Sequence, residues 1–342
     1  MKFLFDFTHP KQCMFFPPII KELQRRGHEV LISTREFGRD GGFIGKLLRK
    51  NGIELPIYKT GGHGKTKLEK LENFAHRTLH LANFMSYEDI DVLVCLSSPS
   101  AVRAAYGLGK KIFVFNDIPE AEHTAKLTIP FADYLFFPFC IPTEHMYRFG
   151  ARNFYIYHAL DPIAWIKDFI PNDKYLERFD LVENEYIVAK HTPITASFNE
   201  GEEDLIANLV NWLIDEIGIR VLVHSYDVAS AQATMPKAEV LEGVVDLQSL
   251  IYYSKLLVTG GGTTNIEAAY FGRDVISARP TLTYYDKYLI SHGLMFHSRD
   301  LDVLKKTCRD SLSNVRLIQT NPLHEMEFPL EKIVDTMEDY LC

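Results

Sequence analysis

The chain has 342 residues, a length that predicts two domains of ordinary size. Hydrophobic residues make up 46% and charged residues 24% of it, and these values exclude a disordered or fibrous protein. The 37 lysines and arginines are outnumbered by 45 aspartates and glutamates. The net charge of −8 argues against a nucleic-acid partner, because such proteins usually carry a basic surface.

The first half alternates short apolar strands with amphipathic helices. We expect strands at 1–7, 28–34, 91–96, 111–115 and 132–137, and a short strand that ends at Tyr58. We expect helices at 16–26, 40–51, 67–85 and 100–108. This alternation predicts βαβ units and a mostly parallel sheet.

The second half repeats the pattern. Strands are expected at 186–189, 220–224, 255–259 and 274–277, and helices at 202–217, 247–253, 264–271 and 330–341. We therefore predict an α/β protein of two doubly wound Rossmann-type domains that face a cleft. The predicted division is 1–160, a hinge at 161–174 with 157–161 as its moving part, and 175–342, with the last helix able to pack back on the first domain. Ligands of such sheets bind at the carboxyl ends of the strands.

The five cysteines and the N-terminal residues indicate the cellular compartment of the protein. The cysteines form no CxxC pair, which argues against a disulfide framework and a structural zinc site. Asp6 and His9 interrupt the first apolar run too early for a signal peptide. Every apolar run is shorter than the roughly 18 residues of a membrane span. These observations predict a cytoplasmic protein.

The sharpest local signal joins a strand to a helix through three glycines and two threonines: Gly260, Gly261, Gly262, Thr263 and Thr264. Glycines allow close approach of the backbone to a ligand, and the N–H groups that begin a helix favour a phosphate. Glu267, one turn later, can accept hydrogen bonds from ribose hydroxyls. The alternative is a structural turn in which Thr264 caps the helix and Glu267 completes a capping box. This loop is not a P-loop, because no lysine follows the glycines.

Other polar residues follow the strands of the first domain. Thr8 and His9 come after the first strand, where His9 is a candidate general base or sugar contact. Lys65 lies in a glycine-rich loop that can close over an anionic substrate. The segment after 111–115 holds a dense group of acid–base side chains, Asp117, Glu120 and His123. Each of these three groups has a structural alternative. It is a turn at the end of the strand for Thr8 and His9, a solvated loop for Lys65, and a capped helix start for the segment after 111–115.

The second domain supplies further candidates. Lys190 and His191 follow its first strand and are placed to neutralise a leaving diphosphate. His224 is a minor candidate, and Arg279 follows 274–277, where it can approach the sugar or the phosphates. Each of these has a plain surface position as its alternative. Two DxD pairs, at 89–91 and 300–302, are interpreted as solvated charge, so we predict no bound metal and no cofactor.

The position of the glycine loop resembles that of the nucleotide site in GT-B glycosyltransferases. Residues 240–254 are similar to the GT-B segment whose backbone holds the base and which leads into the glycine loop. The resemblance implies that Val244 and Val245 lie near a uracil, that 261–264 hold the diphosphate, and that Glu267 holds the ribose. It also implies that no bound metal is needed.

The whole chain resembles an uncharacterised GT-B-like family, a domain of unknown function. That family lies near the UDP-N-acetylglucosamine 2-epimerases and the lipid-linked N-acetylglucosaminyltransferases. The residues that carry this resemblance are 6–10, 27–30 and the glycine loop with Glu267. Asp117 and Glu120 correspond to two epimerase carboxylates, but the first is a glutamate there. The epimerase sequence Gly-Thr-Arg-Pro is also replaced here by residues 7–10.

These observations predict glycosyl transfer from a nucleotide sugar, with UDP-sugar as the expected donor, to an unknown acceptor. His9 or Asp117 would take the proton of the acceptor. One alternative is a nucleotide-sugar epimerase or hydrolase that uses Asp117 and Glu120. The other is a nucleotide-sugar-binding protein without catalysis. Residues 14–16 and 136–139 are candidates for peripheral membrane contact with a lipid-linked acceptor, and core packing is their alternative.

Overall fold

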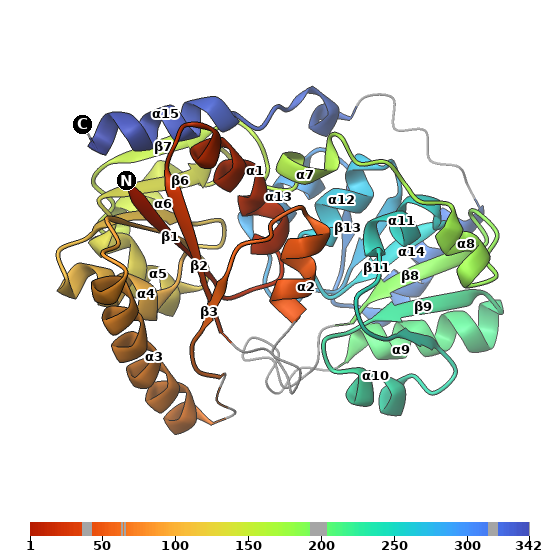
Figure 1. Cartoon of the computed structure of the whole chain (residues 1–342). Coiled ribbons are helices and arrows are strands. Elements are labelled where there is room, and N and C mark those ends of the chain that lie inside the picture. Colours follow the sequence, from red (N-terminus) through yellow and green to blue (C-terminus); the bar gives the residue numbers. More distant parts are fainter. Residues whose placement is uncertain (36–42, 63, 65, 192–203, 314–320, 342) are drawn as a thin grey trace. The chain divides into compact units, whose positions relative to one another are not determined.

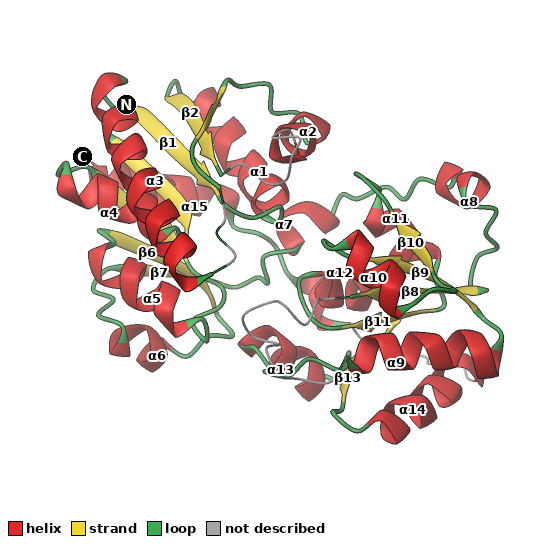
Figure 2. Ribbon diagram, turned by 90° about the horizontal axis from the view of Figure 1, so that it is seen from below, coloured by secondary structure: helices red, strands yellow, loops and turns green. Residues whose placement is uncertain are grey.

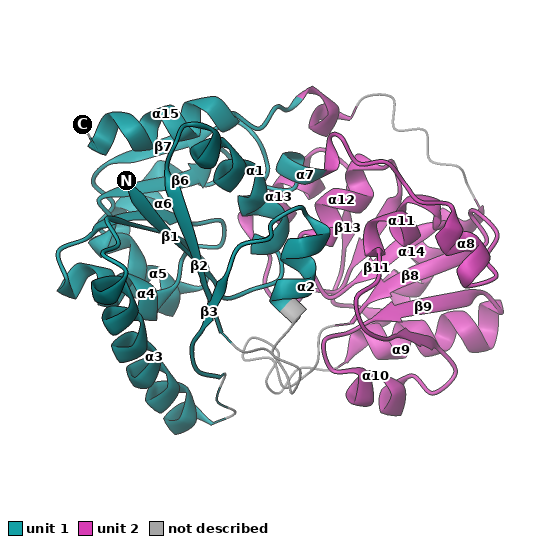
Figure 3. Cartoon of the chain, viewed as in Figure 1, with its two compact units in different colours: residues 1–165, 326–342 teal, residues 166–325 magenta. Residues whose placement is uncertain are grey.

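The computed structural model describes residues 1–35, 43–62, 64, 66–191, 204–313 and 321–341. The chain forms two compact units (Figure 3). Unit 1 consists of Met1–Trp165 together with Met326–Cys342, and unit 2 consists of Ile166–Glu325. The short helix α7 (Ile163–Ile166) lies at the division between them.

Unit 1 contains a seven-stranded parallel sheet (Figure 1). Its strand order is β3-β2-β1-β4-β5-β6-β7, so the chain starts in the middle of the sheet and builds outward in both directions. The strands are β1 (Lys2–Phe7), β2 (Glu29–Thr34), β3 (Ile57–Lys59), β4 (Val92–Leu96), β5 (Lys111–Phe115), β6 (Tyr134–Pro138) and β7 (Phe154–Tyr157).

The helices of unit 1 form two groups that pack among themselves. One group is α1 (Gln12–Arg25), α2 (Phe43–Lys50) and the C-terminal α15 (Leu330–Leu341). The other is α3 (Lys67–Tyr87), α4 (Pro99–Gly107) and α5 (Glu122–Thr128), which continues into the 3-10 turn Ile129–Phe131; α6 (Thr143–Arg148) lies between β6 and β7. Figure 1 shows the two groups on opposite sides of the sheet. Helices on both faces explain why the strands are almost continuously apolar.

Aromatic packing fixes α1 on the sheet. The rings of Phe5 and Phe16 meet edge to face with centroids 5.3 Å apart, and Phe7 meets Phe16 at 5.7 Å. The helix begins at Gln12, four residues before the predicted start, and includes Pro17 and Pro18. It begins early because the Gln12 side chain accepts backbone hydrogen bonds from the two residues that follow β1.

Unit 2 contains a six-stranded parallel sheet in the order β10-β9-β8-β11-β12-β13 (Figure 2). The strands are β8 (Tyr186–Lys190), β9 (Arg220–His224), β10 (Glu239–Leu241), β11 (Leu256–Thr259), β12 (Asp274–Ser277) and β13 (Phe296–His297). The helices are α8 (Lys174–Arg178), α9 (Leu205–Trp212) with the π-helical turn Leu213–Ile217, α10 (Val228–Thr234), α11 (Leu247–Tyr253), α12 (Thr264–Tyr270), α13 (Tyr284–Ser291) and α14 (Leu301–Ser313), followed by the 3-10 turn Pro322–Glu325.

The division of the chain differs from the predicted boundaries. Residues 326–342, placed by number in the second domain, belong to unit 1. There α15 packs on α1, as the sequence analysis allowed for the last helix, and buries Ile333, Val334 and Met337. The predicted hinge residues Tyr157 and Asp161 are fully buried in unit 1. Their side chains bond to each other inside that unit.

Four of the five aromatic residues named as candidates for membrane contact lie in the core of unit 1, and the fifth, Phe139, is half-buried. Phe15, Phe16, Phe136 and Phe137 are each 0% exposed. The prediction of lipid contact is wrong for these side chains, because they pack around the sheet. Among the described residues, no helix combines the length and the apolar character needed to cross the bilayer.

Candidate functional site

The glycine loop lies between β11 and α12 at the carboxyl edge of the unit 2 sheet. Gly261 and Gly262 have φ angles of 112° and 115°, which residues with side chains rarely adopt. The N–H of Gly260 donates to the carbonyl of Lys190 at 3.0 Å, and the N–H of Gly261 donates to the Thr259 hydroxyl at 2.8 Å. Strands β8 and β11 thus hold the loop, and its path requires glycine.

Two cationic side chains lie against these glycines. A Cβ atom added at Gly261 would lie 2.6 Å from Cδ of Arg279. One added at Gly262 would lie 3.9 Å from Cε of Lys190. Gly261 is buried and Gly262 is exposed. An exposed glycine beside a guanidinium and an ammonium group is suited to an anionic ligand.

Arg279 is held in place by a buried carboxylate. Its Nη1 donates to Oδ2 of Asp286 at 3.0 Å, and Asp286 is 1% exposed. Asp286 also accepts from the N–H and the hydroxyl of Thr283 at the start of α13, and from Nδ2 of Asn265 in α12. Arg279 is therefore a half-buried side chain with a fixed position.

The first turn of α12 does not form the capping box that was the structural alternative. Its N-cap residue, Thr263, makes no side-chain cap hydrogen bond. Thr264 is 4% exposed, and its hydroxyl has no partner among the residues that the structure describes. Glu267 is 1% exposed and accepts from Nε2 of Gln248 at 3.2 Å. Because buried polar groups are normally hydrogen-bonded, the Thr264 hydroxyl is a candidate ligand contact.

Lys190 and His224 end the adjacent strands β8 and β9 and lie opposite each other in the register. Nζ of Lys190 lies 5.1 Å from the centre of the Tyr226 ring. Burial, together with the charge of Lys190, lowers the pKa of His224 to about 3. The imidazole is therefore neutral at pH 7, beside the cation that flanks the glycine loop.

Replacing His224 by asparagine is expected to make folding less sensitive to acid. The wild-type imidazole has an ordinary pKa of 6.5 when unfolded and about 3 when folded. Between these values only the unfolded chain binds the proton, so stability falls as the pH drops through this window. At about pH 5.5 the loss from this group is roughly 1 kcal/mol. Urea denaturation of both proteins at pH 7.5 and 5.5 measures it, and equal losses would contradict the prediction.

His191 has a structural environment. It is 1% exposed, its Nδ1 lies 3.3 Å from the Ser225 hydroxyl, and its Nε2 lies 2.8 Å from Oδ2 of Asp204. Asp204 also accepts from the N–H of Ala207 and so begins α9. Burial alone would raise the pKa of Asp204, but the hydrogen bonds from His191 and Ala207 lower it. Because both ring nitrogens are engaged, His191 is left out of the ligand site proposed below.

The predicted base-contacting residues lie between β10 and α11. Val244 and Val245 are both half-buried. Asp246, the next residue, accepts from the N–H of Ser249 at 3.3 Å and begins α11. The segment is therefore anchored by a helix cap and leaves both valines partly accessible.

In unit 1, Thr8 and His9 follow β1. Their backbone N–H groups donate to the side-chain oxygen of Gln12 at 2.5 and 3.0 Å. His9 is exposed, and its Nδ1 accepts from the N–H of Lys11 at 3.3 Å. The segment of Thr8 and His9 therefore forms a structural turn and also exposes the His9 imidazole.

Asp117 belongs to a buried ionic cluster that the sequence analysis did not identify. Its Oδ2 accepts from Nζ of Lys11 at 2.5 Å, and the same Nζ donates to Oδ2 of Asp161 at 2.6 Å. Tyr157 donates its hydroxyl to the other oxygen of Asp161 at 2.5 Å. Burial alone would lower the pKa of Lys11, but the two carboxylates raise it. Lys11, Asp117 and the pair Tyr157–Asp161 come from three distant segments of the sequence, so no spacing pattern reveals the whole cluster.

Glu120 and His123 do not share this environment. Glu120 is half-buried in the loop after β5, and His123 is exposed on the first turn of α5. The N-cap residue of α5, Ala121, makes no side-chain cap hydrogen bond. Asp117 forms an ion pair with Lys11. The predicted group of three acid–base side chains is therefore divided between a buried position and an exposed helix.

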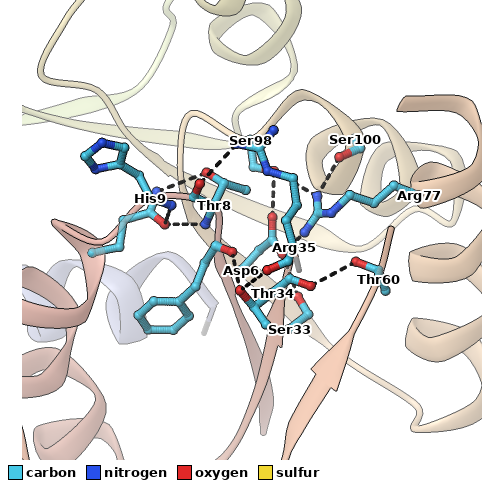
Figure 4. A network of polar contacts seen from close by, with 12 residues as sticks. Asp6, Thr8, His9, Ser33, Thr34, Arg35, Thr60, Arg77, Ser98 and Ser100 are labelled. Carbon is cyan, nitrogen blue, oxygen red and sulfur yellow. Dashed lines mark hydrogen bonds and ion pairs between the residues drawn. The ribbon is translucent and has the colours of Figure 1, made fainter. Parts of the chain in front are cut away.

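A second buried network lies where β1, β2 and β4 end (Figure 4). Asp6 is 0% exposed and accepts from the hydroxyls of Ser33 and Ser98 at 2.7 and 2.6 Å, and from Nη2 of Arg77. Arg77 projects from α3 and also donates to the hydroxyl of Ser100 at 2.5 Å. The one sequence signal for this network was a carboxylate inside an apolar strand.

The glycine-rich loop before α3 is only partly described. Lys65, the predicted cation, lies outside the described residues. A Cβ atom at Gly64 would lie 2.4 Å from the carbonyl carbon of Glu69, so the backbone at Gly64 lies directly on the first turn of α3. Thr66 and Glu69 form a capping box there.

The two DxD pairs have structural contacts. Asp91 accepts from the N–H of Lys2 at 2.8 Å. Asp300 accepts from the N–H groups of Asp302 and Val303 at the start of α14. Within the described part of the chain, no group of three or more His, Cys, Asp or Glu side chains is arranged to hold a metal ion.

Three solved structures cover nearly the whole chain. The UDP-GlcNAc 2-epimerase of Methanocaldococcus jannaschii in complex with UDP-GlcNAc and UDP has a TM-score of 0.78 and 16% identity, covering 99% of both chains. A Staphylococcus aureus MnaA–UDP structure also has a TM-score of 0.78 and 16% identity, covering 99% of this chain and 96% of that one. Acinetobacter baumannii MurG has a TM-score of 0.55 and 16% identity, covering 99% of this chain and 100% of that one. These likenesses confirm the predicted GT-B-like fold of two Rossmann-type domains.

One relative and one protein family match this sequence over nearly its whole length. An uncharacterised protein of Methanocaldococcus jannaschii is 27% identical over 350 residues, which cover 98% of this chain and 97% of that protein. The sequence model of the family described as "Protein of unknown function (DUF354)" matches residues 1–342. The chain therefore belongs to the DUF354 family, and the predicted resemblance to an uncharacterised GT-B-like family is confirmed.

Proposed function

We propose that unit 2 binds the diphosphate of a nucleotide sugar at the glycine loop and that the protein transfers the sugar to an acceptor. The observation that carries this proposal is the pair Gly261–Gly262 with Arg279 and Lys190 against it. Two cations beside the exposed Gly262 match the two charges of a diphosphate. The buried Thr264 hydroxyl supplies a further hydrogen bond.

UDP is the donor nucleotide that we propose. Solved structures of similar fold are described with UDP or UDP-GlcNAc bound. Here the half-buried Val244 and Val245 would lie near the base, and the carboxylate of Glu267 would accept hydrogen bonds from the ribose hydroxyls. Glu267 suits this role because its partner Gln248 fixes the carboxylate at the buried start of α12.

The proposed reaction breaks the bond between the anomeric carbon and the diphosphate oxygen. The bonding electrons leave with the diphosphate, whose growing charge Lys190 and Arg279 offset. The acceptor oxygen forms the new bond to the anomeric carbon, and its proton passes to a base of unit 1. The exposed imidazole of His9 and the carboxylate of Asp117 are the two candidates, and Lys11 holds the latter in one orientation.

Nucleotide-sugar epimerisation is the second candidate function. It is favoured by the TM-scores, which are 0.78 for an epimerase structure and 0.55 for MurG. In this case Asp117 and Glu120 would act on the sugar, and no acceptor would be needed. Incubation with UDP-GlcNAc alone separates the two, because only an epimerase or a hydrolase forms product without an acceptor.

The binding proposal is tested by titrating wild-type protein with UDP, GDP, CMP, ADP and dTDP in a calorimeter. We expect selective binding of UDP, weakened at least about tenfold in Lys190→Gln, because one charge-assisted contact is lost. Lys255→Gln is the matched control, since Lys255 is also half-buried but precedes β11 at the opposite end of the sheet. Absence of nucleotide binding in the wild type, or equal weakening in the two variants, would contradict the proposal. Tight UDP binding without any turnover would favour a non-catalytic binding protein.

A further inference from the structure

Two arginines meet at the Asp6 network of unit 1 (Figure 4). Arg77 reaches the network from α3 and is 2% exposed. Arg35 follows β2 directly, is half-buried, and donates from Nη2 to the carbonyl of Thr8 at 3.0 Å. Both guanidinium groups therefore lie at the carboxyl edge of β1 and β2, where ligands of parallel sheets bind.

Asp6 already has several hydrogen-bond donors. Its Oδ1 accepts from Ser33 and Arg77, and its Oδ2 accepts from Ser98. Burial and the charge of Arg77 lower the pKa of Arg35, and the opposing effect of Asp6 is smaller.

Arg77 also has unused hydrogen-bonding capacity. Its two terminal nitrogens donate to Asp6, Ser98 and Ser100. Its Nε is buried and has no hydrogen-bond partner within the described ranges. A buried N–H group without a partner costs about 1–3 kcal/mol, which a ligand oxygen would recover.

We propose that this corner of unit 1 binds an oxyanion, a carboxylate or phosphate group of a small molecule, between Arg35 and Arg77. Planar guanidinium groups match the oxygens of such groups through paired hydrogen bonds. Gly61, with a φ of +56°, packs beside the base of the Arg77 side chain: a Cβ there would lie 3.7 Å from Cβ of Arg77. The site is separate from the glycine loop of unit 2 and does not depend on nucleotide binding. That the anionic group belongs to the sugar acceptor is a further step, which rests on the proposed function.

The Nε–H resonance of Arg77 tests the site directly. Protein labelled with ¹⁵N at the arginine Nε is titrated with inorganic phosphate and, separately, with acetate, at constant ionic strength. Arg77→Lys identifies the resonance by its loss. We expect a saturable shift of this resonance with at least one of the two anions. In Arg35→Gln we expect the dissociation constant of that anion to rise at least about tenfold, because one charged hydrogen-bond donor is removed.

Two control variants test whether the anion response depends on this site in particular. Arg103→Gln removes the same charge from an exposed position on α4 and is expected to leave the titration unchanged. Lys190→Gln alters the glycine loop of unit 2 and is also expected to leave it unchanged, which separates this site from the proposed nucleotide site. A linear or absent response to both anions, a response that persists in Arg35→Gln, or one that disappears in Lys190→Gln would overturn the proposal.

Discussion

Replacing Lys11 by methionine is expected to lower the free energy of unfolding by about 3–5 kcal/mol. The Lys11 ammonium group holds the carboxylates of Asp117 and Asp161 at 2.5 and 2.6 Å, and all three side chains are at most 9% exposed. Methionine fills a similar volume but leaves two negative charges buried without their cation. The unpaired charge of Asp161 accounts for more of this loss than that of Asp117. Asp161 is 0% exposed, and among the described residues the Tyr157 hydroxyl is its remaining side-chain partner.

Denaturation by urea, followed by circular dichroism, measures this loss. Lys111→Met is the matched control: Lys111 lies 3.8 Å from Asp133, but its side chain is 48% exposed, so a change below about 0.5 kcal/mol is expected. Adding Asp117→Asn to Lys11→Met should recover part of the stability, since one unpaired charge disappears. Similar stabilities for Lys11→Met and Lys111→Met would show that the cluster does not stabilise the fold.

Replacing Gly261 by alanine is expected to abolish nucleotide binding while also destabilising unit 2. The new methyl group would lie 2.6 Å from Cδ and 2.9 Å from Nε of Arg279. Since Asp286 holds that arginine, either the loop or the guanidinium group has to move. The φ of 112° adds backbone strain, and together the two effects should cost about 2–3 kcal/mol.

The control variant Gly272→Ala distinguishes the effect of backbone strain from that of a steric clash with Arg279. Gly272 has a φ of +72°, but no atom lies within 4 Å of the position of its Cβ. This variant is expected to lose about 1 kcal/mol of stability and to keep wild-type affinity for UDP. Calorimetric titration and thermal denaturation of both variants give the two quantities. If Gly261→Ala bound UDP as the wild type does, the glycine loop would not be the phosphate site.

The regular parts of the fold were predictable because their signals are local. The structure has β9 and β12 at the predicted residues, where apolar runs of strand length are bounded by polar turns. The last helix, α15, also has the predicted bounds. Elements with weaker patterns were not predicted, such as α13, whose sequence mixes tyrosines with charged residues, and β13, which has only two residues.

In the candidate site, too, the features with a local sequence signal were predictable and the long-range contacts were not. The glycine loop was recognisable because its glycines are consecutive and join a strand to a helix. Asp6 and Arg77 are 71 positions apart, and Lys11 and Asp161 are 150 apart. Contacts over such separations depend on the strand order of the sheet, which a single sequence does not reveal. The ion pair of Arg279 could not be predicted for a related reason, because its partner Asp286 belongs to the unpredicted α13.

The return of α15 to unit 1 has a consequence for the order of folding during synthesis. All residues of unit 2, 166–325, are translated before Met326, whereas unit 1 needs a segment that is translated after them. Unit 1 lacks its last helix until then, and the surface of α1 that α15 covers stays open to water. The unit that is translated first is therefore the one that is completed last.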